Sequence, residues 1–300
     1  MFCTWYETRK SETPSSPETK SFIDLSPLLV TMETILSDNR RKEVPIDNQS
    51  PLKRLSYGLK EIRKTQLGEK FQTADCIGKN ESFNIWKISM ERASTWLTYL
   101  DQFQSLEFDE KITITRCMWL LFRRIERCAM TAELRRTKMC KKNEYLIKTD
   151  TVVNTDSVKW DFNWLSHFSP DQLRTFVGNT SAILCESVTE CMMEVQPTDE
   201  ELCYILCVLC FYHIGNKIGG SMQKTTERLL NILADNLHEY YVEQKDATRY
   251  SYRLTKILKI SQQYKTLMEE KRRTEVLGDV FGAFRVKWSH SEIFQHSHFQ

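Results

Sequence analysis

Glycine and proline are scarce in this sequence, which has nine glycines and seven prolines among 300 residues. So low a content argues against turn-dense β-folds and against the glycine-rich loops that cradle phosphates. We find neither a dinucleotide-binding fingerprint nor a phosphate-binding loop. Abundant Leu, Ile, Met, Glu and Lys instead favour a mostly helical protein.

No charge of one sign dominates either, because 42 Lys and Arg residues nearly balance 40 Asp and Glu residues. The chain therefore has no global field that points to nucleic acid or to a membrane. Long apolar runs are missing too. The longest, residues 202–214, contains His213 and is shorter than the ~18 residues that a membrane span needs, so we predict a buried core helix. Residues 1–20 are polar and show no signal peptide.

Ten cysteines are spaced irregularly, mostly within apolar helical patterns, which suits a reducing compartment better than a disulfide framework. Cys203, Cys207 and Cys210 have the spacing of an iron–sulfur site, but their unbroken apolar helical context favours core packing. A second group, with no cysteine or carboxylate cage nearby, is interpreted as a polar tail: His290, His296 and His298. We predict neither a metal site nor a cofactor.

The N-terminal part of the chain differs in composition from the rest. Residues 1–50 are a low-complexity stretch with Ser, Thr, Pro and Glu, and we predict a disordered tail. Residues 51–82 are expected to form a basic amphipathic linker helix, which ends near Gly68, and a loop. Four apolar residues lie on one face of that helix: Leu52, Leu55, Leu59 and Ile62.

Residues 96–119 are the most informative segment. They predict the end of one amphipathic helix, a short acidic turn, and the start of a long apolar helix with Asp109 as its N-cap. Apolar residues at three- and four-residue steps share one face of the first helix: Trp96, Leu97, Leu100 and Phe103. The second helix carries a further apolar set: Ile112, Ile114, Met118, Trp119 and Leu121.

This segment resembles the signature of the ligand-binding domains of nuclear hormone receptors. The signature runs Trp, three residues, apolar, two residues, Phe, two residues, Leu, two residues, Asp, and its positions here are Trp96, Leu100, Phe103, Leu106 and Asp109. Residues 197–211 are similar to the eighth-helix region of the family, an apolar helix after a Pro-Thr-acidic cap. The resemblance covers residues 83–295, and the divergence elsewhere is similar to the nematode branch of the family.

The resemblance implies an all-α fold, a three-layer antiparallel helical sandwich with one small β-hairpin, over residues 83–300. Local patterns agree with this expectation. Val, Thr and aromatic residues predict the hairpin at 145–160. Helical periodicity predicts the other elements: 110–131, 170–195, 199–214, a helix after Gly219-Gly220, and a last long helix at 250–277.

Members of the family sense their ligand through the last helix, which completes a groove for coregulator helices of sequence Leu-x-x-Leu-Leu. The resemblance places the groove residues at Thr98, Arg116, Glu292, Ile293 and Phe294. The match is partial, because Thr98 replaces a lysine and Ser289 and His290 replace two apolar residues.

Residues 25–29 (LSPLL) themselves match the coregulator motif. Such a segment is able to fold as a short helix and dock in a receptor groove, its own or a partner's, with Pro27 tolerated in the first turn. A chance match is the competing interpretation.

Residues 116–142 are strongly basic, and we favour a solvated helix end over a nucleic-acid patch. Arg123 and Arg127 are candidate anchors for an acidic or phenolic ligand, because a buried guanidinium needs a partner. An internal carboxylate such as Glu126 is the competing partner. The resemblance implies a lipophilic small molecule in a pocket between three helices: 84–105, 117–130 and 250–277.

The resemblance also implies a homodimer or a heterodimer with another nuclear receptor, through exposed residues of the last long helix: Leu254, Leu258 and Tyr264. Only Cys3 and Cys76 precede the signature, too few for the paired zinc sites of the family's DNA-binding domain. We therefore expect no direct DNA binding from this chain, and no membrane association.

The sequence thus predicts a regulator of transcription in the nucleus, and in the cytoplasm as a second location, that acts through a lipophilic ligand, coregulator proteins and a receptor partner. A ligand-independent helical scaffold, which modulates other receptors by dimerisation, is the alternative. An enzyme is the most distant hypothesis, because no paired carboxylates, nucleophile–base motif or phosphate cradle is found.

Overall fold

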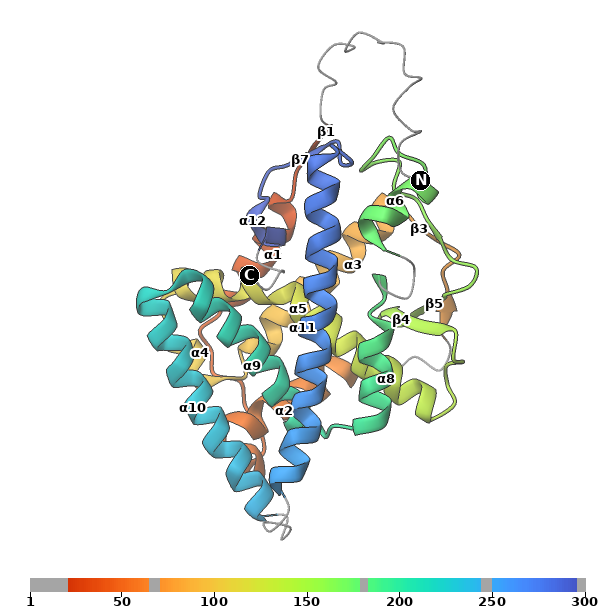
Figure 1. The fold of residues 1–300 in the computed structure, drawn as a ribbon. Coiled ribbons are helices and arrows are strands. Elements are labelled where there is room, and N and C mark those ends of the chain that lie inside the picture. The colour runs from red at the N-terminus through yellow and green to blue at the C-terminus, as the bar shows by residue number, and fades with distance from the viewer. Residues whose placement is uncertain (1–20, 65–70, 179–182, 244–249, 296–300) are drawn as a thin grey trace, which may run out of the picture.

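A computed structural model describes residues 21–64, 71–178, 183–243 and 250–295 (Figure 1). This part of the chain is largely helical with three small sheets, and its helices form the expected three-layer sandwich. Two long helices in the middle, α5 (Phe108–Arg136) and α9 (Asp199–Ile218), pack against each other. Around them lie α2 (Pro51–Lys64), α3 (Lys79–Leu97), α8 (Glu186–Val195), α10 (Gly220–Glu243) and α11 (Tyr250–Val280).

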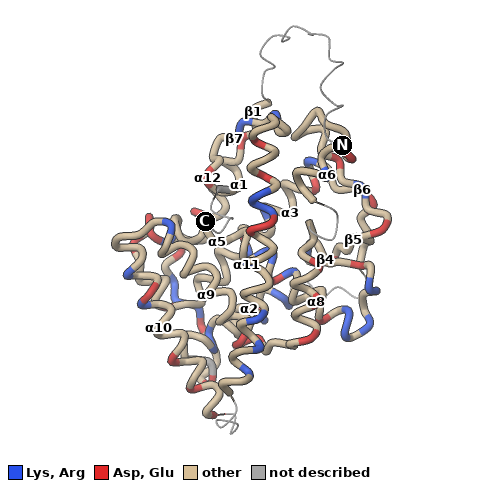
Figure 2. Tube along the Cα trace, in the orientation of Figure 1, with Lys and Arg blue, Asp and Glu red and all other residues tan. Residues whose placement is uncertain are grey.

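The layers follow from which helices touch. α3 packs on α5, and α8 packs on α5 from another side. α11, the long blue helix in front in Figure 1, lies against α8 and α9, whereas α10 runs along α9. Charges of both signs are interspersed along α10, which Figure 2 shows at the edge of the molecule. Five shorter elements complete the helices of the described residues: α1 (Ser26–Leu36), η1 (Ile46–Asn48), α4 (Asp101–Gln104), α6 (Pro170–Val177) and α12 (Glu292–Gln295).

The start of α9 agrees with the sequence. Thr198 is its N-cap: the Thr198 hydroxyl accepts from the Glu201 backbone N–H at 3.3 Å, and the Glu201 carboxylate accepts from the Thr198 N–H at 2.9 Å. Such a reciprocal pair satisfies two donors at a helix start. The prediction of Asp109 as the N-cap of α5 is wrong. That helix begins at Phe108 with Glu107 as its cap, because Glu110 accepts from the Glu107 N–H.

The hairpin at 145–160 is confirmed. It consists of β4 (Glu144–Lys148) and the antiparallel β5 (Thr151–Asn154). Three further pairings, all parallel, involve strands that the sequence did not predict. They are β2 (Gln72–Thr73) with β5, β3 (Cys76–Ile77) with β6 (Lys159–Trp160), and β1 (Ser21–Ile23) with β7 (Val286–Trp288).

The predicted disordered tail over residues 1–50 is wrong for residues 21–50, which form β1, α1 (Ser26–Leu36) and η1. Residues 1–20 lie outside the described part. α1 buries a row of apolar side chains against α3 and α5, and that burial offsets the entropy cost of ordering the segment.

The linker prediction for residues 51–82 also needs correction. The amphipathic helix is present as α2, but it belongs to the folded domain, since it packs on α3, α9 and α10. Its apolar face lies in the main core. Trp96 stabilises the contact between α3 and α2, because the indole Nε1 of this fully buried side chain donates to the Leu55 carbonyl at 3.0 Å.

Among the described residues, α9 is long and apolar enough to cross a membrane, judged by its length and composition alone. Of its apolar window, 67% is buried inside the protein, as expected for the predicted core helix. Cys203, Cys207 and Cys210 lie within it and are buried. Burial raises the pKa of all three thiols, which opposes the thiolate form that a metal cluster requires and supports core packing.

Candidate functional site

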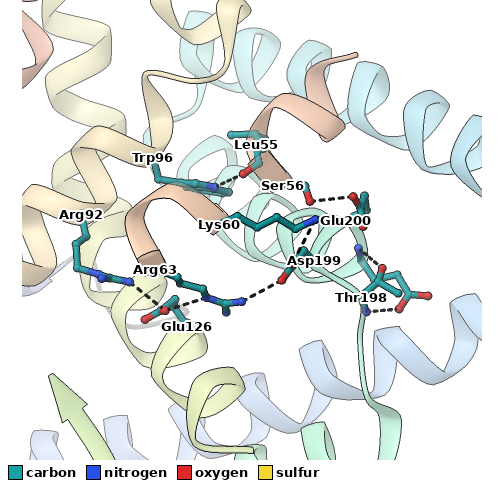
Figure 3. A network of polar contacts seen from close by, with 11 residues as sticks. Leu55, Ser56, Lys60, Arg63, Arg92, Trp96, Glu126, Thr198, Asp199 and Glu200 are labelled. Carbon is teal, nitrogen blue, oxygen red and sulfur yellow. Dashed lines mark hydrogen bonds and ion pairs between the residues drawn. The ribbon is translucent and has the colours of Figure 1, made fainter. Parts of the chain in front are cut away.

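A buried network of charges joins four helices at the centre of the domain (Figure 3). The Glu126 carboxylate of α5 contacts the guanidinium groups of Arg63 at 3.3 Å, Arg92 at 3.1 Å and Arg127 at 2.5 Å. Arg63 also reaches Asp199 at the start of α9, at 2.9 Å. The network therefore links α2, α3, α5 and α9 through side chains far apart in the sequence.

Two opposing effects act on Glu126. Burial disfavours its charged form, but the three guanidinium groups outweigh burial and lower the pKa of Glu126 to about 2. Glu126 is therefore ionised at neutral pH and fully engaged. Arg127 thus has the internal partner that the sequence analysis offered as the alternative to a ligand, and the anchor hypothesis narrows to Arg123.

Arg123 lies on α5 among other cations. Its Nε is buried without a hydrogen-bond partner, and burial together with the neighbouring Arg124 lowers the pKa of Arg123 to about 10. The Nη1 atom of Arg124 lies 3.0 Å from the sulfur of Met268 on α11. In the part of the chain that the structure describes, no ion pair involves Arg123 or Arg124.

A third cation, Lys271 of α11, approaches the same region. Its Nζ lies 3.4 Å from the Ile183 carbonyl and 3.8 Å from the Cys185 sulfur. The Cys128 thiol and the cations at Lys271 and Arg124 lower the pKa of Cys185, despite its burial. Burial lowers the pKa of Lys271 itself. The interior between α5, α8 and α11 is thus cationic.

The predicted groove residues lie on three elements. Thr98 is buried at the C-terminal end of α3, and its hydroxyl donates to the Thr95 carbonyl at 2.6 Å. Arg116, on the first half of α5, contacts Glu33 of α1 at 3.4 Å. Glu292 is half-buried at the start of α12. α12 contacts α5 and α1 contacts α3 and α5, so these elements meet at one corner of the domain.

The last helix is fixed by aromatic packing. Ile293 is buried, and its carbonyl accepts from the Trp119 indole of α5 at 3.2 Å. The Phe294 ring lies 5.0 Å from Trp86 of α3 and 5.0 Å from Trp288. α12 therefore rests on α3 and α5.

Sequence reasoning missed two parts of this corner. Ser289, where the family has an apolar residue, accepts a hydrogen bond from the Leu25 N–H at 2.8 Å and donates its own N–H to Ile23 at 3.0 Å. Trp86 was not singled out. The sequence signal for the contact between Ser289 and Leu25 was the LSPLL motif. The aromatic cluster around Trp86 gives no local signal, because its members are distant in sequence. His296 and His298 lie outside the described residues.

The predicted dimer surface on α11 is partly wrong. Tyr264 is fully buried and faces Arg124, so it cannot contact a partner. Leu254 is half-buried against the core, whereas Leu258 is 42% exposed. Other large apolar side chains on or next to α11 are also exposed: Tyr252, Val276, Leu277, Val280 and Phe281.

A cleft of about 40 Å³ lies between α5, α8 and α9, beside Arg63 and Met192. A drug-sized ligand needs roughly 300 Å³ or more, so this cleft is no lipophilic pocket. Of the three helices that the sequence proposed as the pocket lining, only the one at 117–130 contributes to this cleft, through Ala129.

A three-layer helical sandwich with a short hairpin and a last helix resting on α3 and α5 defines the class of ligand-binding receptor domains. Residues 67–281 match the family model described as the ligand-binding domain of nuclear hormone receptor. The chain belongs to the nuclear hormone receptor family.

Curated relatives agree with this membership. The chain is 40% identical over 277 residues to nuclear hormone receptor family member nhr-44 of Caenorhabditis elegans. The matched region covers 92% of this chain and 65% of that protein. Family members nhr-98 and nhr-130 of the same organism are 33% and 32% identical and also cover 92% of this chain. The chain spans less than two thirds of the length of these three relatives.

Proposed function

We propose that this chain forms the regulatory domain of a nuclear receptor that binds a lipophilic ligand with an acidic head group, anchored by Arg123. The observation that carries the proposal is the cationic interior between α5, α8 and α11. Arg123, Arg124 and Lys271 gather there, and no carboxylate forms an ion pair with the first two among the described residues. Since buried charges require partners, a ligand carboxylate would complete the set.

Accessibility of these side chains supports a space at this place. Arg123, Arg124 and Lys271 are deep in the fold, yet each is only half-buried. Met268 and Tyr264 of α11 lie beside Arg124 and are fully buried.

A matched pair of probes tests the anchor. We expect a fluorescent long-chain fatty acid to bind the purified domain at least tenfold more tightly than the alcohol of the same chain length, because only the acid is charged. The substitution Arg123→Met should abolish this preference. Arg136→Met, on the exposed end of α5, is the control and should retain it. Equal binding of acid and alcohol by the unsubstituted protein would refute the anchor.

We further propose that the domain acts in the nucleus through coregulators and a receptor partner rather than through DNA contacts of its own residues. The meeting of α1, α5 and α12 around Arg116 supports a coregulator groove, and exposed apolar side chains on α11 support a dimer surface. The ligand-independent scaffold is the second candidate. It would be favoured if neither probe binds while the domain still associates with a receptor.

A further inference from the structure

We propose that α1 occupies the coregulator groove of its own chain, so that a partner helix binds only after α1 has left. This inference rests on the proposed coregulator groove and adds its regulation. α1 begins at the LSPLL segment, and one face of it is buried through five apolar residues: Leu25, Leu28, Leu29, Met32 and Leu36. On the opposite face Val30 is 59% exposed.

The apolar row has the spacing of a docked amphipathic helix. Leu25, Leu28 and Leu29 fall three and four residues apart and therefore lie on one face. That face packs on α3 and α5, the same helices on which α12 rests. A partner helix of the Leu-x-x-Leu-Leu type would need this surface, because recognition of such helices depends on burying those leucines in an apolar groove.

Polar contacts at both ends of α1 come from the groove elements. At its start, the Leu25 N–H donates to the hydroxyl of Ser289, three residues before α12. Towards its end, Glu33 pairs with Arg116 of α5 at 3.4 Å. Arg116 is the basic residue that the resemblance assigned to gripping a partner helix. In this structure Arg116 forms its ion pair with Glu33 of α1.

The polar contacts that hold α1 in place are few and weak. β1, which precedes it, pairs with β7 over three residues only. The Glu33–Arg116 pair is 42% and 28% exposed, and pairs of this kind contribute little. A tethered helix nonetheless acts at a high effective concentration, which disfavours a partner in trans. Because β7 leads to α12, release of α1 would also free one support of the last helix.

A labelled peptide with the sequence of residues 21–37 is a suitable probe, since it carries the side chains seen in the groove. We expect the unsubstituted domain to bind it weakly. The double substitution Leu28→Ala and Leu29→Ala should raise affinity at least tenfold, because it loosens α1 without altering the groove. Val30→Ala, on the exposed face of the same helix, is the matched control and should change affinity less than twofold.

A second variant, in which a charge is reversed, keeps the test usable if the double variant does not fold. Glu33→Arg replaces a partly exposed residue, places it against Arg116, and should raise peptide affinity about threefold. Adding Arg116→Glu to the variant with Leu28→Ala and Leu29→Ala should lower its affinity for the peptide. A peptide that carries Glu33→Arg should restore that affinity.

The outcomes separate this inference from the proposed function. Equal, tight binding by the unsubstituted domain and both loosened variants would leave the groove in place and overturn its occupation by α1. No binding by any variant that remains helical and cooperatively folded would overturn the groove itself.

Discussion

At the residue scale, the domain depends on a few buried charges whose partners come from other helices. Glu126 pairs with Arg63, Arg92 and Arg127 at once, and all four side chains are buried. A charge left unpaired in this environment costs far more than an exposed one. Arg123, close by on the same helix, has no such carboxylate, which is why it remains the candidate for a ligand.

Replacing Glu126 should therefore destabilise the domain strongly. We expect Glu126→Gln to lower the free energy of unfolding by about 3–5 kcal/mol at neutral pH, because three guanidinium groups lose their shared carboxylate. Urea unfolding measures this loss. Glu133→Gln, on an exposed position of the same helix, is the control and should have an effect within about 0.5 kcal/mol.

The same residue predicts a pH dependence. Its folded-state pKa, about 2, lies below the ordinary value of 4.5, so its contribution is full above pH 4.5 and is lost as the pH falls towards 2. The difference in unfolding free energy between the unsubstituted protein and Glu126→Gln should shrink across that window. A difference that stays constant from pH 6 to the acid limit of the folded state would contradict the assignment.

At the element scale, helix ends decide how the layers join. Thr198 caps α9 and also accepts from the Tyr240 hydroxyl of α10 at 3.2 Å, while Glu201 binds Tyr241 at 2.7 Å and Arg253 at 2.5 Å. The first turn of one helix thus organises α9, α10 and α11. The cap was visible in the sequence, but its two tyrosines were not.

Removing this cap should have a moderate effect. We expect Thr198→Ala to cost about 1–2 kcal/mol of unfolding free energy, since it removes the cap bond and the tyrosine contact. Thermal or urea unfolding provides the measurement. Thr255→Ala, at an exposed position of α11 where the hydroxyl contacts only its own helix, should be nearly neutral. Equal losses in the two variants would show that the cap adds nothing.

At the scale of the whole molecule, α11 exposes large apolar side chains to solvent. Among its residues Tyr252 and Leu258 are exposed, and Leu258 was predicted to lie on the dimer surface. Exposed apolar residues along one long helix are typical of an association surface when they form a continuous patch. Tyr264 does not belong to this surface, because it faces the interior.

Association through α11 predicts a specific mutational effect. We expect Leu258→Glu to weaken self-association, or association with a partner receptor domain, at least tenfold, because it places a charge in an apolar contact. Sedimentation velocity over a concentration series measures it. Ile218→Glu is a matched control, since Ile218 is 43% exposed at the end of α9 and Leu258 is 42% exposed. A similar loss in both variants would exclude α11 as the particular surface.

Local sequence patterns determined the helices, the hairpin and the cap of α9, because each depends on neighbours within a few residues. The Trp96–Trp119 segment and its resemblance also indicated the family. Tertiary structure alone decided that residues 21–50 fold, that Arg127 pairs with Glu126, and that Tyr264 points inward. The physical reason is that periodicity identifies the apolar face of a helix but not the element that covers it. Burial, ion pairing and docking are fixed only when residues distant in sequence meet.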